Sequence, residues 1–388
     1  MTWKARVYYG GRVDFWIPLL SYFNLAGAIH ALIQALVLFF VHRGNRRANR
    51  IMSFFLTALA LGMSNGVMTQ MGLYDRLPAL SIPMGAVVLA FGPLFYFYIR
   101  AMTARDRSWA PVDALHGLPF LLGLVAYGAY LRWSLGGPMP TGIFGAIART
   151  PWSLVMVLST LQTIVYVAAI VRLLRAYSLR IKAAFSTIDR IHLGWLRRRL
   201  FVYAAIWGIG VVLIAAVRSD TRAIALIAQI LAFLTALNAF VTGYRAMLQP
   251  DIYFGPDEAE PRRKYKRSSL TPEAAASYKK HLLELMERER PYLDPEIALP
   301  SLAQAMGISA AHLSRVLNEN LGRNFYEFIN RYRVEEAQRR LAGPGAARDK
   351  LITVALECGF NSLATFNRVF KEIAGLTPSE YRKSASAG

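Results

Sequence analysis

Apolar residues fill the first two thirds of the chain in seven long runs, separated by short polar and basic stretches. Each run is close to the roughly 20 helical residues that cross a hydrocarbon core of about 30 Å. The first run is too long for a removable signal peptide, and it lacks a small-residue cleavage site. The pattern therefore predicts seven membrane-spanning helices, at residues 17–41, 51–71, 82–102, 112–131, 152–174, 200–217 and 223–247.

After residue 271 the pattern changes to a helical period with a polar face, interrupted by glycine, serine and proline. Pro272 is expected to open a charged helix that runs to about Arg290. Two similar units follow, each with a short helix, a turn at Gly307 or Gly359, and a second helix. Ser309 is the expected N-cap of one second helix, and Asn361 or Ser362 that of the other.

The second of these units shows the two faces most clearly. Asn367, Arg368 and Lys371 lie on one side of its second helix, and apolar residues such as Phe366 and Phe370 on the other. A short helix, a tight turn and a second helix with a polar, basic face predict a helix-turn-helix unit. The expected core positions are Leu302, Leu313, Val316, Leu321, Phe325, Phe328, Leu341, Leu356, Phe360, Phe366 and Phe370.

One long helix, Phe325 to Leu341, is predicted between the two units. At about 1.5 Å per residue it spans roughly 25 Å. That length suits two recognition helices placed about one DNA turn, roughly 34 Å, apart, so that both enter successive major grooves on one face of the duplex.

The last hundred or so residues resemble the AraC family of bacterial transcription regulators. The resemblance rests on the doubled unit, on the run LA...GIS..HLSR (Leu302 to Arg315) and on GF.S...F.R.FK...G.TP..YR (Gly359 to Arg382). The preceding ERPYLDPEIALPSLA (Glu289 to Ala303) is similar to the lead-in of membrane-bound members of that family. One departure is Asn318-Glu319-Asn320, where the family often has Phe-Lys-Lys, which implies a weaker grip on phosphate there.

The resemblance implies that DNA contacts fall on the outer face of each second helix. Arg315 and Arg368 have the most suitable chemistry, because a guanidinium can bridge O6 and N7 of guanine. The implied DNA-binding residues are Ala311, Ser314, Arg315 and Asn318 in the first unit, and Leu363, Asn367, Arg368 and Lys371 in the second.

The fold predicted for the whole chain is all-α: a seven-transmembrane-helix bundle followed by a cytoplasmic AraC-type double helix-turn-helix, or homeodomain-like, domain. We expect a transmembrane, sensor domain at residues 1–249 and a basic linker with a connecting helix at 250–290. The DNA-binding domain is expected at 291–388.

The distribution of charge sets the expected orientation. The net charge is +21, but residues 271–388 hold 16 Lys and Arg against 14 Asp and Glu, so nearly all of the excess lies in the apolar part. The loops after the odd-numbered spans carry 21 Lys and Arg, and the other side carries eight. The positive-inside rule then places the N-terminus outside and the C-terminal domain in the cytoplasm, for a multi-pass protein of the bacterial inner membrane.

Uncharged polar residues within the spans are candidates for a ligand site in the bundle. They could equally form hydrogen bonds that hold the helices together. No span contains a clearly buried Asp, Glu, Lys or Arg, which argues against a proton- or ion-coupled transporter. The candidate ligand-binding residues are Asn24, His30, Gln34, Asn65, Gln70, His116, Gln162, Gln229 and Asn238.

The loop after the fifth span carries an apolar stripe at Ile181, Phe185, Ile188, His192 and Trp195. Such a segment could lie on the inner leaflet as an amphipathic helix, or it could extend the fifth span.

The sequence contains no HExxH, P-loop, GxSxG or kinase motif, and its histidines lack metal-ligand spacing, so we expect no enzyme, no cofactor and no metal site. The one cysteine, Cys358, is expected to be a small buried residue. The predicted function is a membrane-embedded one-component transcription regulator. The alternatives are a transporter or membrane-enzyme bundle whose state a fused DNA-binding domain reports, and a bundle that is only an anchor. The expected partners are double-stranded promoter DNA, the lipid bilayer, an unknown small-molecule or membrane signal, and a second copy of the chain in a homodimer.

Overall fold

The computed structural model describes residues 13–42, 44–103, 110–138, 151–188, 191, 193–217, 221–249, 270–343 and 349–387. The chain divides into two compact units, residues 1–175 with 193–252, and residues 176–192 with 253–388. The segment 176–192 therefore packs with the C-terminal residues, although it lies within the apolar part of the sequence. Most of the expected basic linker, residues 250–269, lies outside the described residues.

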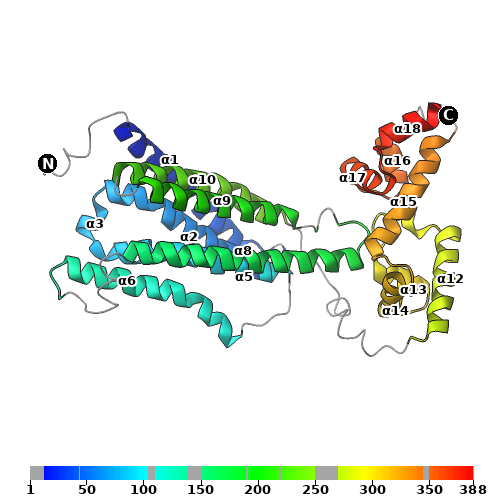
Figure 1. The fold of residues 1–388 in the computed structure, drawn as a ribbon, viewed down its shortest axis with the longest axis horizontal. Helices are drawn as coiled ribbons and strands as arrows, with labels where there is room; N and C mark the ends of the chain where they lie inside the picture. The colour runs from blue at the N-terminus through cyan, green and yellow to red at the C-terminus, as the bar shows by residue number, and fades with distance from the viewer. Residues whose placement is uncertain are drawn as a thin grey trace. The chain divides into compact units, whose positions relative to one another are not determined.

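The described residues form helices, and the single β-contact among them is an isolated antiparallel bridge between Phe185 and Ala298. The all-α fold predicted from the sequence is therefore confirmed. The first unit contains α1 (Val13–Phe40), α2 (Arg46–Gln70), α3 (Leu73–Arg76), η2 (Pro78–Leu80), α4 (Ser81–Ala86), η3 (Val87–Ala90), α5 (Phe91–Thr103), η4 (Pro111–Gly117), α6 (Leu118–Ser134), most of α8 (Pro151–Ala184), α9 (Gly194–Val217) and α10 (Thr221–Leu248) (Figure 1).

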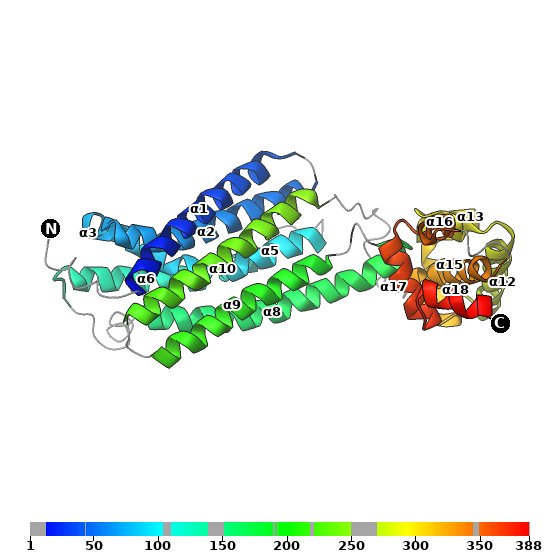
Figure 2. The same cartoon turned by 90° about the horizontal axis from the view of Figure 1, so that it is seen from above.

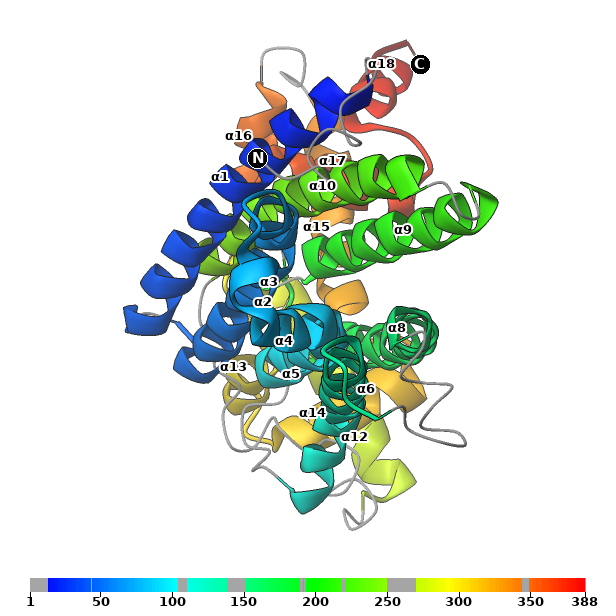
Figure 3. The same cartoon turned by 90° about the vertical axis from the view of Figure 1, so that its left-hand side faces the viewer.

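Seven helical stretches of the described residues are long and apolar enough to cross a membrane, and they coincide with the seven runs expected from the sequence. Within this unit α2 occupies a central place, since it contacts α1, α5 and α10 (Figure 3). Its buried side chains include Met52, Phe55 and Leu56. Many outward-facing side chains of the other helices are large and apolar.

The third stretch is the most irregular of the seven. Pro83 and Pro93 lack the backbone N–H that an α-helix needs, and between them the chain tightens into the 3₁₀ turn η3. Pro119 lies in the first turn of α6, where the missing N–H costs nothing.

One expectation about the spans is wrong: a charged pair is buried in the first unit. The Arg100 guanidinium donates to both carboxylate oxygens of Asp113, with N–O distances of 2.6 and 2.7 Å. Both side chains are almost fully buried. The residues lie at the end of α5 and in η4, on either side of residues 104–109, and periodicity alone does not reveal such a pairing. Because the pair is bidentate and jointly neutral, it can connect two helices in apolar surroundings.

The second unit is built around α15 (Phe325–Ala342), which confirms the long helix predicted between the two helix-turn-helix units. The remaining elements are α12 (Pro272–Arg288), η5 (Pro291–Leu293), α13 (Leu299–Ala305), α14 (Ala310–Arg315), the π-helical turn η6 (Val316–Asn320), α16 (Leu351–Glu357), α17 (Leu363–Ala374) and α18 (Pro378–Ala387). Helices α12–α14 gather at one end of α15, and α16–α18 at the other (Figure 1).

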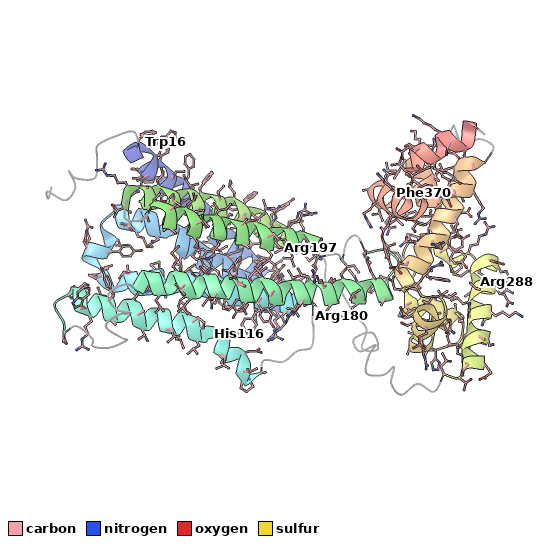
Figure 4. The ribbon with its side chains drawn as sticks, viewed as in Figure 1. Trp16, His116, Arg180, Arg197, Arg288 and Phe370 are labelled. Atoms are coloured by element: carbon pink, nitrogen blue, oxygen red, sulfur yellow. The ribbon has the colours of Figure 1, made fainter. Side chains whose placement is uncertain are left out.

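Two apolar cores flank α15. One joins Leu282 of α12 with Leu302, Leu313 and Phe325. At the other end the Phe366 ring packs against those of Phe360 and Phe370, with ring centroids 5.3 and 5.5 Å apart, and Phe370 (labelled in Figure 4) is fully buried. Most of the expected core positions are buried, but Leu356 is 53% exposed, so its assignment to the core is wrong. Cys358 is buried as expected, and burial raises the pKa of its thiol to about 12.

Candidate DNA-binding interface

The two helix-turn-helix turns have the same geometry. Gly307 and Gly359 both have a positive φ, +67° and +83°, which glycine adopts without steric cost. In each turn the next residue closes the same hydrogen bond to the residue five positions earlier, Ile308 N to Ala303 O at 3.0 Å and Phe360 N to Ala355 O at 2.9 Å. This repeated closure, of the type that ends many helices, sets the angle at which the second helix leaves the first.

Serine caps both second helices. Ser309 Oγ accepts from the backbone N–H of His312, and Ser362 Oγ accepts from that of Thr365, both at 3.2 Å. The expected cap at Ser309 is confirmed, and of the two candidates for the second cap the structure selects Ser362. Each cap satisfies one backbone donor and so defines where the second helix of its helix-turn-helix unit begins.

The four residues expected to contact DNA in the first helix-turn-helix unit differ in exposure. Ala311 is half-buried, whereas Asn318 is exposed. Arg315 is partly exposed and pairs with Glu319 at 2.7 Å. Ser314 is only 6% exposed, and both its hydroxyl and its carbonyl oxygen accept from the Asn318 amide. Ser314 thus lies beneath Asn318 and holds it in position.

The four residues expected to contact DNA in the second helix-turn-helix unit lie along α17. Asn367, Arg368 and Lys371 are exposed, and Leu363 is half-buried at the start of the helix. Arg368 donates to the Tyr326 hydroxyl at 3.1 Å and lies 3.6 Å from Glu372. Its guanidinium is therefore oriented by α15 but still half-exposed.

The junction between the two helix-turn-helix units is held by Arg333 of α15, one of the most buried side chains among the described residues. Its Nε donates to Tyr292 O at 2.7 Å, and one Nη donates to Asp294 O at 2.8 Å. Burial lowers the pKa of Arg333 to about 10, so the surrounding oxygens must compensate a costly buried charge.

Further oxygens around Arg333 come from a segment that sequence reasoning did not connect with this domain. We call residues 181–188, the end of α8 and the four residues after it, the docked segment. Arg333 donates to Ser186 Oγ at 3.2 Å and to Thr187 Oγ1 at 3.3 Å. Asn330, also buried, donates to Ser186 O at 3.2 Å.

The docked segment is also bonded to the chain that leads into α13. Ser186 Oγ donates to Ile297 O at 2.7 Å, and Thr187 Oγ1 donates to Pro295 O at 2.8 Å. Ile181, Ser186 and Ile188 are buried. Of the predicted apolar stripe, Ile181, Phe185 and Ile188 belong to this C-terminal unit, whereas Trp195 belongs to the other unit and His192 lies outside the described residues. The helix itself extends the fifth span as far as Ala184 (Arg180, one turn earlier, is labelled in Figure 4).

One aromatic residue touches both the docked segment and the second recognition helix. Lys182 Nζ lies 5.6 Å from the centre of the Tyr326 ring, within cation–π range. The hydroxyl of the same tyrosine accepts from Arg368. Tyr326 is thus in direct contact with a residue of α8 and with a candidate base-reading residue.

The polar ligand-site candidates of the seven-helix unit do not all line one cavity. Several make hydrogen bonds between helices, the other role considered for them. Gln70 bonds to Ser21, Asn65 accepts from Tyr74, His116 bonds to Tyr166 at 2.6 Å, and the His30 ring lies 4.8 Å from that of Phe240. The other such bonds join Asn24 to Gln229 at 2.7 Å, Gln34 to Phe240 O at 3.1 Å, and Asn238 to Arg199 at 3.1 Å. Asn65 and Gln162 line a half-open cavity.

Comparison with known proteins agrees with the two helix-turn-helix units seen in the C-terminal part of the chain. Residues 302–384 match the family described as "Helix-turn-helix domain". The chain is 40% identical over 88 residues to an uncharacterized HTH-type transcriptional regulator of Staphylococcus aureus, a match covering 22% of this chain and 11% of that protein. It is 32% identical over 83 residues to an HTH-type transcriptional regulator of Mycobacterium tuberculosis, covering 21% of this chain and 31% of that one.

The matches to relatives are short, and the matched part spans about a tenth of the Staphylococcus aureus relatives' length. No solved structure matches the chain significantly. The part of the chain that the family match covers is a helix-turn-helix domain of AraC type.

Proposed function

We propose that this chain is a membrane-embedded, one-component transcription regulator that binds duplex DNA sequence-specifically. The observation that carries the proposal is a pair of helix-turn-helix units with matching turns at the two ends of α15, in a chain with seven helices of spanning length. Arg315, Asn318, Asn367 and Arg368 would read base edges, and Ala311 and Leu363 would contact thymine methyl groups. Lys371 would hold a phosphate, and Ser314 would orient Asn318.

A direct test uses the full-length chain in lipid nanodiscs. Chromosomal sites bound by the tagged protein are mapped, and the strongest site is titrated against a scrambled duplex at fixed salt. A specific regulator should prefer its site by roughly 10³-fold or more. Equal affinity for both duplexes would contradict the proposal.

The proposed orientation has the N-terminus outside and the C-terminal unit in the cytoplasm of a bacterial inner membrane. It is supported by the excess of Lys and Arg in alternate loops. A fluorescent reporter that matures only in the cytoplasm should be active when fused after residue 388, and a periplasmic phosphatase fused there should be inactive. The reverse result would remove the helix-turn-helix domain from the side that holds the chromosome.

We further propose that the docked segment passes the state of the bundle to the DNA-binding domain. The support is that α8 is one helix from Pro151 to Ala184, and that Ser186 and Thr187, which follow it, bond to Arg333, Asn330 and the lead-in to α13. A signal that binds one arrangement of the bundle better than another would shift docking by its difference in affinity. A homodimer on repeated sites would multiply the effect.

Docking can be locked and released with a disulfide. Phe185 and Ala298 form an antiparallel bridge, and such partners have Cα atoms about 4.5–5.5 Å apart, within the range a disulfide spans. In purified Phe185→Cys/Ala298→Cys protein we expect oxidation to change affinity for the mapped site by about 5-fold or more. The wild-type chain, whose single cysteine is buried, is the control and should not respond. Equal affinities in the oxidised and reduced variant would exclude a regulatory role for docking.

A further inference from the structure

The first unit contains a half-open cavity of about 410 Å³ between α2, α5, α8, α9 and α10. This volume is in the range of small-molecule sites, which commonly lie between the helices of bundles. The cavity belongs to the first unit alone, and two of its longest walls come from α8 and α9.

The lining is apolar and uncharged. Rings of Phe55, Phe95, Tyr203 and Trp207 form much of the wall, and no Asp, Glu, Lys, Arg or His is among the described lining residues. The buried pair Arg100–Asp113 is not part of it, and its charges already neutralise each other. A charged ligand would therefore lose its hydration without gaining a counter-ion, so the cavity selects uncharged, largely apolar molecules.

Most hydroxyl groups on the wall are already used. Ser159, Thr163 and Thr235 donate to carbonyl oxygens of their own helices at 3.1, 2.8 and 2.8 Å. Tyr166 bonds to His116. These four give the ligand little polar recognition. The Tyr203 hydroxyl of α9 is buried without a hydrogen-bond partner among the described residues, so it remains able to bond to a ligand.

Gln162 of α8 differs from these groups. Its Nε2 is buried and has no hydrogen-bond partner among the residues that the structure describes. A buried, unpaired amide donor is costly, and a ligand with a hydroxyl, ether or carbonyl oxygen would remove that cost. Because Gln162 also lines the cavity, this donor marks where the polar end of a ligand would lie.

We infer that the cavity binds an uncharged, membrane-soluble molecule that carries one hydrogen-bond acceptor, with the acceptor at Gln162 Nε2 and the apolar body against the rings of α2, α5 and α9. The inference rests on the proposed function as a regulator and gives the chemical class of its signal. The ligand would touch α8, the helix whose other end forms the docked segment. Occupancy can then favour one position of α8 over another.

The test uses full-length protein in nanodiscs and two matched probes, a medium-chain alcohol and the corresponding carboxylic acid, each bearing a diazirine and an alkyne. After photolysis, labelled residues are located by mass spectrometry, with unlabelled alcohol as competitor. We expect the alcohol to label α8 and α9 at cavity-lining residues, saturably. The ionised acid should label them at least tenfold less.

Two variants one residue apart on α9 provide a matched control. Ala204 lines the cavity, whereas the neighbouring Ala205 is exposed on the outer face of the unit. Ala204→Trp should abolish saturable labelling and Ala205→Trp should leave it unchanged. Gln162→Leu should weaken competition by the alcohol about threefold to tenfold. If Ala204→Trp does not fold, Ala232→Phe fills the same cavity from α10.

The possible outcomes separate this inference from the proposed function. Labelling that does not saturate, or that falls on outward-facing residues, would identify bulk lipid as the source and overturn the inference. So would equal labelling by the acid, or an Ala204→Trp variant that labels like wild type. Titration of the mapped DNA site on the same samples tests the regulator itself: DNA binding without cavity labelling rejects the ligand site alone. Cavity labelling without specific DNA binding rejects the regulator and leaves an apolar ligand site.

Discussion

Arg368 is the single residue on which base recognition by the second unit is expected to depend most. It is half-exposed, and its hydrogen bond to Tyr326 limits the conformations it must lose on binding. Arg368→Ala should weaken binding to the mapped site by about 1–3 kcal/mol and relax the preference at one base position. Fluorescence anisotropy with the site and its single-base variants measures both effects.

Arg288 offers the matched control for that measurement. It is an exposed arginine on α12, outside both helix-turn-helix units, paired with Glu289 at 2.8 Å (labelled in Figure 4). Arg288→Ala should leave affinity and base preference unchanged. If Arg368→Ala behaves the same way, Arg368 is a solvated surface residue and the assignment of the reading face fails.

Residue-scale expectations succeeded where the cause is local and failed where it is tertiary. The caps at Ser309 and Ser362 and the turn glycines follow from backbone chemistry within a few positions. Ser314 was expected on the outer face and is buried, and Leu356 was expected in the core and is exposed. Periodicity identifies the two faces of a helix, but the packing of neighbouring helices decides which side chains are buried.

At the scale of elements, the two turn glycines are equivalent in conformation but not in surroundings. A Cβ on Gly359 would lie 2.5 Å from Tyr292 O and 2.9 Å from Arg333 Nε, whereas a Cβ on Gly307 would meet nothing within 4 Å. Gly307→Ala should cost only the positive-φ penalty, about 1–2 kcal/mol. Gly359→Ala should cost clearly more, because it also displaces Arg333 from the carbonyl oxygens that compensate its charge.

Hydrogen exchange in the full-length protein can compare the two variants through the slowest amides of α15. Faster exchange in Gly359→Ala than in Gly307→Ala is the expected order. Equal protection would show that the close packing around Arg333 contributes little to the stability of this unit.

The docked segment shows why an element can be predicted and its partner missed. The apolar stripe at Ile181, Phe185 and Ile188 was visible, but its hydrogen-bond partners lie more than 100 positions later in the chain. Ser186 and Thr187 are common loop residues, and nothing in their local sequence reveals that they bond to Arg333 and to the lead-in to α13. The Arg100–Asp113 pair was missed for a similar reason, since each residue lies at the end of a different helix.

At the scale of the whole molecule, the two units share one continuous helix, because α8 supplies the cavity wall in one unit and the docked segment in the other (Figure 2). The transmission that we propose from the bundle to the DNA-binding domain would run through this helix. If the link operates through the rigid helix, the rotational phase of α8 should matter more than its length. An α-helix turns by about 100° and rises about 1.5 Å per residue.

Insertions between Arg175 and Ala176, where the units divide, test that phase. Two inserted alanines rotate the end of α8 by about 200°, and four rotate it by only about 40° beyond a full turn, although they lengthen the helix more. In the Phe185→Cys/Ala298→Cys background we expect two alanines to lower the rate of disulfide formation by about fivefold, and four to restore most of it. Equal rates in all three proteins would mean that the first unit does not constrain docking through α8. Any control of DNA binding would then have to reach the second unit by another route.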